Sequence, residues 1–197
     1  PSGCAFTWDF VTATSGLFGA DTLWDFAAVR EEDLAVSVFK GVSAGLFENN
    51  CDWDPNNGAA PYQIFPPDQG ADHYFAHGIS NGRLNADAYP DLVVALRHYD
   101  VCIPNECVSW DGAVGILLGL PDGSFKAESP EQTYIFDTEG LSGKNTAGAA
   151  LIAVVDMNGD GFDDIVVSNH ESGQEPPNPE PDNISVLINK MIGSIGP

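Results

Sequence analysis

The sequence DMNGDGFDDIVV, residues 156–167, places a loop of oxygen-bearing residues directly before a β-branched strand. Carboxylate or amide side chains occupy positions 1, 3, 5 and 9 of this loop, and the carbonyl at position 7 adds another oxygen. In order along the chain these residues are Asp156, Asn158, Asp160, Phe162 and Asp164. Oxygen ligands suit a hard cation, and Ca²⁺ accepts about six to eight of them. The sequence therefore predicts one strong Ca²⁺ site in this loop.

The loop differs from an EF-hand, because Val167 stands at position 12, where an EF-hand carries a bidentate Glu. Gly161 at position 6 permits the sharp turn that points the oxygens at one centre. The alternative is a turn without a metal, since Asn, Asp and Gly are common in turns. Carboxylates this close repel one another without a cation, which favours a metal loop inside a β-sheet. Asp163, at position 8, is expected to point away as a solvated charge.

Composition limits the classes of partner. The chain has 197 residues, 43% of them apolar, enough for one domain with a sizeable core. Its formal net charge is −22, so nucleic acids and anionic membranes should be repelled. Cations, or copies of the chain bridged by cations, are compatible partners. The longest apolar runs fall short of the ~18 residues of a bilayer span, so no membrane insertion is expected.

Four cysteines without CxxC pairs favour disulfides and an oxidising, extracellular location over a metal site. Cys102 and Cys107 enclose a short turn and are expected to pair, which leaves Cys4 to pair with Cys51. Three pairings exist for four cysteines, and this one rests on proximity alone. The chain begins with Pro1, so we expect a mature secreted product or a fragment.

The calcium loop recurs twice in weaker form, as LFGADTLWDFAAV at residues 17–29 and RLNADAYPDLVV at 83–94. A second block recurs downstream of each copy: VSVFKGVSAGLF (36–47), VGILLGLPDGSF (114–125) and ISVLINKMIGSI (184–195). Each unit thus predicts strand, acidic loop, strand, connection, strand, glycine turn and strand.

This pattern describes a four-stranded antiparallel blade, and no stretch shows helical periodicity. The predicted fold is all-β, a single β-propeller-like domain over residues 1–197. Its approximate blades span 6–50, 72–137 and 147–197. Residues 51–72 are expected to be a turn-rich connector anchored to the body by aromatic and aliphatic side chains.

On these motifs the chain resembles the VCBS/FG-GAP repeat proteins, whose blades build β-propellers such as the integrin α-subunit head. The third copy matches that repeat best, the second well, and the first only beside the others. The resemblance implies an extracellular, calcium-stabilised propeller that serves adhesion, sugar binding or assembly. It implies no single activity.

The two weaker loops depart from the family pattern. In the second, Arg83 replaces the first carboxylate while Asn85, Asp87 and Asp91 remain. Its guanidinium is expected to act as an internal cation for both aspartates, so no metal is predicted there. In the first loop only Asp21 and Asp25 survive, which predicts turn-stabilising hydrogen bonds and at most a weak site.

Propellers usually close with four to eight blades, and this sequence holds three. Open blade edges invite another chain, so three explanations stand beside one another. The chain is a fragment of a longer propeller, closes with a second copy, or feeds a polymer. A compact stack capped by its insertions is a fourth.

No residues suggest catalysis, and the chain is not expected to be an enzyme. The four histidines (His73, His77, His98 and His170) lack a metal-binding spacing. Trp110 is a candidate sugar contact, whereas Trp24 is expected to pack inside its repeat. Asn183 begins a candidate N-glycosylation sequon.

The first hypothesis for function is a non-catalytic extracellular module for self-assembly or adhesion, a subunit of a surface or filamentous structure. Its partners would be copies of itself, or surface glycans and proteins. The alternatives are a carbohydrate-binding propeller and an accessory fragment of a larger secreted protein.

Overall fold

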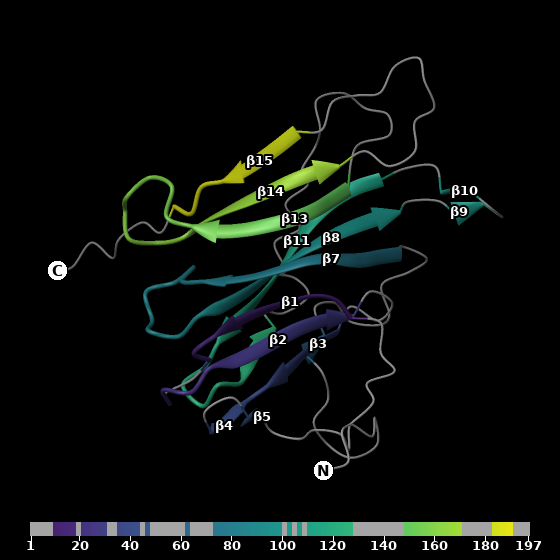
Figure 1. Ribbon diagram of the computed structural model, residues 1–197. Coiled ribbons are helices and arrows are strands. Elements are labelled where there is room, and N and C mark those ends of the chain that lie inside the picture. Colours follow the sequence, from purple (N-terminus) through teal and green to yellow (C-terminus); the bar gives the residue numbers. More distant parts are fainter. Residues whose placement is uncertain are drawn as a thin grey trace, which may run out of the picture.

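The computed structural model describes residues 10–18, 21–30, 35–43, 46–47, 62–63, 73–99, 102–103, 106–107, 110–127, 148–170 and 183–190. All regular structure in these segments is β, and every strand pairing is antiparallel. Three sheets follow one another in chain order, with the first at the bottom and the third at the top of Figure 1. This confirms the prediction of an all-β antiparallel fold. None of these segments forms a helix long and apolar enough to cross a membrane.

The middle sheet, sheet 2, has the four-stranded form that the repeat predicts. Its strands are β7 (His73–Gly82), β8 (Asp91–Tyr99), β11 (Trp110–Gly119) and β12 (Phe125–Ala127), in the spatial order β12-β11-β8-β7. The glycine turn after β11 closes with a hydrogen bond of 2.9 Å from the Gly123 N–H to the Leu120 carbonyl. A separate hairpin of β9 (Cys102–Ile103) and β10 (Glu106–Cys107) lies between β8 and β11 in the chain.

Sheet 1 departs from the predicted strand list in one respect. It contains β1 (Phe10–Gly16), β2 (Asp25–Arg30), β3 (Ala35–Phe39) and β6 (Tyr62–Gln63), in that order. The expected fourth strand is β5 (Leu46–Phe47), but it pairs with β4 (Gly41–Ser43) in a small hairpin. The segment expected to be only a connector therefore supplies the fourth strand, and that expectation was incomplete.

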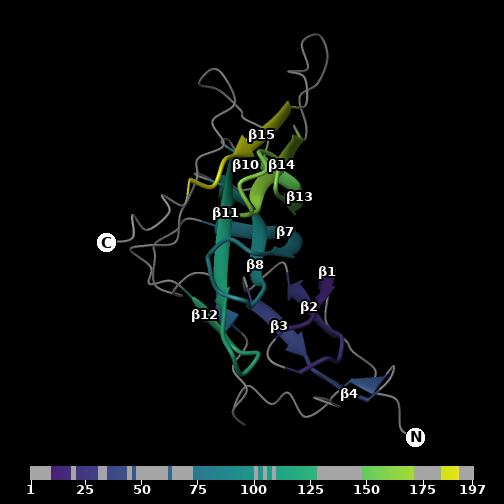
Figure 2. The same cartoon turned by 90° about the vertical axis from the view of Figure 1, so that its left-hand side faces the viewer.

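Sheet 3 is formed by β13 (Gly148–Val155), β14 (Asp164–His170) and β15 (Asn183–Leu187), in that order. The strand expected to follow residue 190 lies outside the described residues. Figure 2 shows the same succession of sheets from a second side, with β13 next to β7 and β1 on the other side of β7.

Strand β8 is buried on both faces because it lies at the centre of the stack. Leu92, Val94 and Leu96 face sheet 1, while Val93 and Ala95 between them face sheet 3. All five are fully buried. Continuous apolar sequence with a period of two on each face is expected for a strand covered on both sides.

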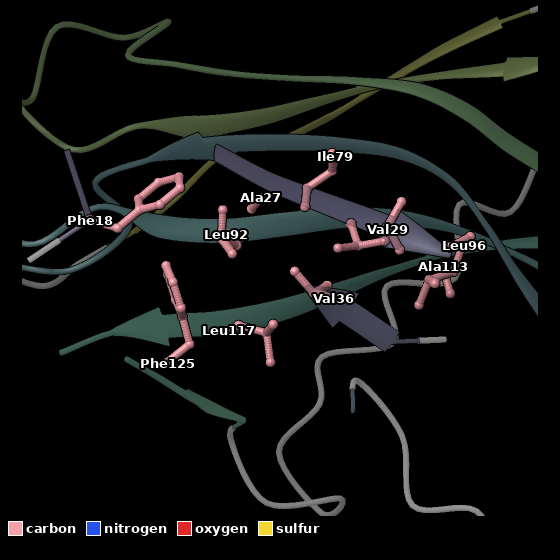
Figure 3. Close-up of a cluster of buried hydrophobic side chains, with 12 residues drawn as sticks. Phe18, Ala27, Val29, Val36, Ile79, Leu92, Leu96, Ala113, Leu117 and Phe125 are labelled. Carbon is pink, nitrogen blue, oxygen red and sulfur yellow. The ribbon is translucent and has the colours of Figure 1, made fainter. Parts of the chain in front are cut away.

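The core between sheets 1 and 2 is the larger of two apolar clusters (Figure 3). Val29 and Val36 from sheet 1 meet Leu92, Leu96 and Leu117 from sheet 2, as Figure 3 shows. Near one end the rings of Phe18 and Phe125 pack edge to face, with centroids 5.3 Å apart. Phe18 belongs to the first acidic loop, so this loop is held by the core of the neighbouring sheet.

Gly82, the last residue of β7, lies directly against sheet 3. A Cβ at this position would overlap Cγ1 of Val154 and lie 2.7 Å from Oδ2 of Asp163. Both of those atoms belong to sheet 3 or its loop, so the missing side chain lets the two backbones come together.

We predict that Gly82→Ala lowers the free energy of unfolding by about 1–3 kcal/mol, the usual cost of overpacking a well-filled interior. Urea denaturation would measure it. Adding Val154→Ala to Gly82→Ala removes the overlapping methyl groups and should cost less than the sum of the two single substitutions. Additive costs would show that the overlap is not the cause.

Candidate metal centre and the buried aspartates

The third loop, residues 156–164, is wound around its first aspartate. The two carboxylate oxygens of Asp156 accept hydrogen bonds from the N–H groups of Gly159 at 2.6 Å and Gly161 at 2.9 Å. Both glycines have positive φ, 78° and 93°, which side-chain-bearing residues rarely adopt. The expected role of Gly161 in the sharp turn is thereby confirmed. Donation from the Gly161 N–H holds the pKa of Asp156 below its ordinary value of 3.8, so this carboxylate is ionised at neutral pH.

The next two polar residues continue the winding. Oδ1 of Asn158 accepts a hydrogen bond of 2.8 Å from the N–H of Asp160, and Oδ1 of Asp160 accepts one of 2.9 Å from the N–H of Phe162. The amide of Asn158 also donates to Oδ2 of Asp160 at 2.9 Å. The Asn158 and Asp160 side chains are exposed, so an ion could reach their oxygens from solvent.

The other two loops use the same local hydrogen bonds. In the second loop, Oδ1 of Asn85 accepts from the N–H of Asp87, and Oδ1 of Asp87 accepts from the N–H of Tyr89, both at 2.9 Å. In the first loop, Oδ1 of Asp21 accepts from the N–H of Leu23 at 2.8 Å. The turn is therefore made by the side chains themselves, as expected for Asp21 in the first loop.

The position-9 aspartates are the most uniform feature of the three repeats. Asp25, Asp91 and Asp164 are almost fully buried, with exposed fractions of 1%, 0% and 0%. Oδ2 of each accepts a hydrogen bond of 2.9 Å from the N–H at position 2 of its own loop. These donors are Phe18, Leu84 and Met157 in turn.

The second oxygen of each aspartate reaches the end of the third strand. Oδ1 accepts from the N–H of Gly41 at 2.7 Å for Asp25, of Gly119 at 3.0 Å for Asp91, and of Asn189 at 2.8 Å for Asp164. We call each such aspartate a latch. It ties the loop that starts the second strand to the residue where the third strand leaves the sheet.

The expected internal cation is not formed in the second loop. Both oxygens of Asp91 accept backbone N–H groups, and the Arg83 side chain is exposed. The backbone of Arg83 contacts sheet 3 instead: its N–H donates to Oδ2 of Asp163 at 2.7 Å. The prediction is wrong because the Arg83 side chain lies at the surface, while the N–H groups of Leu84 and Gly119 bind Asp91.

Asp163 is likewise not the solvated charge that was expected. Besides accepting from the Arg83 N–H, it donates its own N–H to the Arg83 carbonyl at 3.0 Å. The amide of Asn189 adds a hydrogen bond of 2.7 Å to the Leu84 carbonyl. Asp163 and Asn189 thus fasten the third loop to the second, and sequence reasoning missed both. Nothing in the sequence marks Asp163 as a contact to the second loop, because its partner there is the backbone of Arg83 and not a recognisable side chain.

The side chains of the predicted metal ligands do not converge on one point in this structure. Among the described residues, no three acidic, His or Cys side chains converge as a metal cluster. The carboxylate of Asp164 is buried and already accepts two N–H groups. Each carboxylate oxygen has two lone pairs, so one accepted hydrogen bond leaves room for an ion. The donor set of Asp156, Asn158, Asp160 and the Phe162 carbonyl fits Ca²⁺ chemically, and the site itself stays a prediction.

The remaining sequence-predicted residues lie apart from this loop. The backbones of Cys102 and Cys107 are direct cross-strand partners in the β9–β10 hairpin, which suits the expected disulfide. Their side chains, and all of Cys4 and Cys51, lie outside the described residues. Trp110 and Asn183 begin β11 and β15, and their side chains are not described either. The pairing, the sugar contact and the glycan therefore stay predictions.

Trp24, which was expected to pack inside its repeat, is 63% exposed. It occupies position 8 of the first loop, where Asp163 in the third loop contacts the preceding sheet. Leu17 of the same loop and Val42 of the β4–β5 hairpin are 40% and 51% exposed. The packing expectation is wrong because no described sheet precedes sheet 1.

Comparison with known families agrees with this geometry. Residues 83–167 match the model of the FG-GAP-like repeat. The matched segment runs from the second loop through β8, β11, β12 and β13 to the third loop and into β14. It confirms the resemblance to FG-GAP repeat proteins over most of the second copy and the loop of the third. No curated protein and no solved structure matches the chain significantly.

We predict that removing a latch destabilises the fold. Asp91→Ala leaves the buried N–H groups of Leu84 and Gly119 without their acceptor, at a cost of about 2–4 kcal/mol in the free energy of unfolding. Chemical denaturation monitored by fluorescence measures it. Asp87→Ala, which removes only exposed turn hydrogen bonds, is the control and should cost under about 1 kcal/mol. Equal losses would argue against the latch.

We predict that the contributions of Asp91 and Asp156 to folding stability depend on pH in opposite ways. Burial raises the pKa of Asp91 above 3.8, although the N–H groups of Gly119 and Leu84 lower it in part. The contribution of Asp91 to stability is therefore full below pH 3.8 and lost as the pH rises through its native pKa. That of Asp156, whose pKa is lowered, is present above pH 3.8 and lost as the pH falls through its native pKa.

We accordingly expect the stability difference between the wild type and Asp91→Asn to favour the wild type most at acidic pH and to shrink toward neutrality. For the wild type against Asp156→Asn the difference should grow over the same range. Urea unfolding at several pH values, without added Ca²⁺, measures both. The same trend for the two variants would contradict this assignment.

Proposed function

We propose that the protein is a non-catalytic, calcium-stabilised module of β-propeller type that serves self-assembly or adhesion outside the cell. The observation that carries this proposal is the third loop. Among the described parts of the three loops, it alone has carboxylate or amide side chains at positions 1, 3, 5 and 9 together with hydrogen bonds to the neighbouring sheet. The FG-GAP-like match over residues 83–167 supports the same reading.

The ion would be held by Asp156, Asn158, Asp160 and the carbonyl of Phe162. Asp164 would be the fifth protein ligand, sharing its oxygens with the amides of its latch. When bound, Ca²⁺ would neutralise the negative charge of the aspartates and fix the loop. In the first loop Leu17 holds position 1, and in the second Arg83 does, so neither offers a comparable set.

The consequence of binding follows from the neighbours of these ligands. Phe162 precedes Asp163, which contacts the second loop, and Asp164 is the latch of sheet 3. An ion in the third loop would therefore stiffen the contact between sheets 2 and 3 as well as the loop. An extracellular location and the expected disulfides are compatible with such a stabilised, acidic module.

We predict that chelation with EGTA lowers the melting temperature and that Asp160→Ala abolishes this response. A ligand bound only by the native state adds about 2.7 kcal/mol at one hundred times its Kd. Differential scanning calorimetry with and without Ca²⁺ measures the shift. Asp87→Ala, the equivalent change in the second loop, is the control and should keep the full response. A wild-type melting temperature indifferent to Ca²⁺ would refute the metal.

A second candidate function, carbohydrate binding, is favoured by the exposed indole of Trp24. Flat aromatic faces stack on sugar rings, and Leu17 of the same loop is a further exposed apolar residue. A glycan array probed with the wild type and with Trp24→Ala tests this. Binding that survives the substitution, or no binding by either protein, would exclude this surface as the sugar site.

A further inference from the structure

The outer face of sheet 3 is an apolar surface turned away from sheet 2. Strand alternation places Ile152, Val154, Ile165, Val167 and Leu187 toward sheet 2, where they form the second apolar cluster. The alternate residues face outward. They are Leu151, Ala153, Val155, Val166, Ser168, Ile184, Val186 and the following Ile188.

The exposed residues of this face lie on the two outer strands of sheet 3, β13 and β15, and just after β15. Leu151 and Ile184 are 70% and 69% exposed and lie on either side of Ser168 in one cross-strand row. Val155, Val186 and Ile188 are 43–46% exposed. None of these eight residues is charged, although the whole chain carries a formal charge of −22. Asp164, which alternation also places on this side of β14, is fully buried and bound by two N–H groups. An apolar, uncharged patch on so acidic a protein indicates an interaction surface.

The equivalent face of sheet 2 shows what kind of surface packs against such residues. Val166 and Val186 are the repeat equivalents of Val93 and Ile116, which sheet 3 covers in sheet 2. Ile184 corresponds in the same way to Val114, which is fully buried. The outer face of sheet 3 therefore continues an interface that exists one sheet earlier, and another β-sheet is its natural cover.

The two ends of the stack are not equivalent. In sheet 1 the residues that alternate with the core positions include Ala28 and Phe39, which are only 3% and 7% exposed. Phe39 is stacked on Phe26 with ring centroids 4.3 Å apart. Other apolar residues at this end are exposed, among them Val11, Leu17 and Trp24 at 40%, 40% and 63%, and they come from β1 and the first loop.

We infer that the outer face of sheet 3 binds the same face of a second copy of the chain, forming a two-fold symmetric dimer. The inference rests on the assembly role proposed above and names its surface. Identical patches pair readily about a two-fold axis, and an uncharged face is where two acidic copies approach with least repulsion. Because each copy uses the same face, the two-fold pairing occupies that face on both copies and assembly through it stops at two.

The size of the face sets the expected affinity. Three strands about 4.8 Å apart and about six residues long, at about 3.3 Å per residue, span about 300 Å². A stable complex usually buries about 800 Å² per partner, so the dimer should be weak and concentration-dependent. Screening of the like charges should make salt strengthen it.

Sedimentation velocity over three decades of protein concentration, at low and high NaCl and with Ca²⁺, tests the inference. We expect a monomer–dimer equilibrium that shifts toward dimer with salt. Leu151→Asp and Ile184→Asp should each weaken it at least tenfold, because each places two like charges in the interface. Both side chains are already mostly exposed, so folding should survive, and thermal unfolding verifies this. Leu151→Ser is the milder variant should Leu151→Asp fail to fold.

Val42→Asp, at an exposed position of the β4–β5 hairpin, is the matched control and should leave the equilibrium unchanged. A monomer at every concentration and salt level, a dimer indifferent to both face variants, or species larger than dimers would overturn the inference. Repeating the series in EGTA separates it from the metal. Loss of the calcium effect on melting with an intact dimer would refute the calcium site alone.

Discussion

The stack of sheets depends on one interaction made three times: a buried aspartate that accepts two backbone N–H groups. Asp25, Asp91 and Asp164 stand at the first residue of a second strand, where the chain leaves its acidic loop. One oxygen holds the loop and the other holds the end of the third strand. A buried carboxylate is costly unless such donors satisfy it. In return, the two amides it binds would be unpaired without it, so each of the three groups requires the others.

This arrangement explains how the loops can differ in metal ligands while the sheets stay alike. The position-5 aspartates and Asn85 shape their turns by local hydrogen bonds, and the latch closes each unit. Neither contact uses an ion. The first loop can therefore carry Leu17 and Trp24, and the second Arg83, without loss of the strand geometry. A metal in the third loop would add to a structure that the amides already define.

Structure could be predicted from the sequence where a pattern recurs in all three repeats, and could not where a contact is made in one repeat only. The period of two around Val93 and Val114 predicted strands, and the three-fold recurrence predicted their grouping into sheets. Tyr62 and Gln63 form too short a strand to show any period, so their pairing with β3 escaped notice. An aspartate that binds a cation and an aspartate that accepts backbone N–H groups cannot be told apart in the sequence. Only its burial and its hydrogen bonds from the Leu84 and Gly119 N–H groups show that Asp91 is a latch.

The same reasoning explains two opposite errors of prediction. Asp163 was expected to be solvated and is bound, whereas Trp24 was expected to be packed and is exposed. Both occupy position 8, whose surroundings are set by the loop of the preceding sheet. In the third loop that neighbour is the backbone of Arg83, and Asp163 is bound by it. In the first loop no described sheet precedes it, and Trp24 is exposed. Position 8 thus belongs to the contact between sheets, and a residue there can be understood only together with the sheet before it. Because Asp163 lies between a candidate metal ligand and a latch, the third loop and the contact between sheets 2 and 3 form one continuous unit.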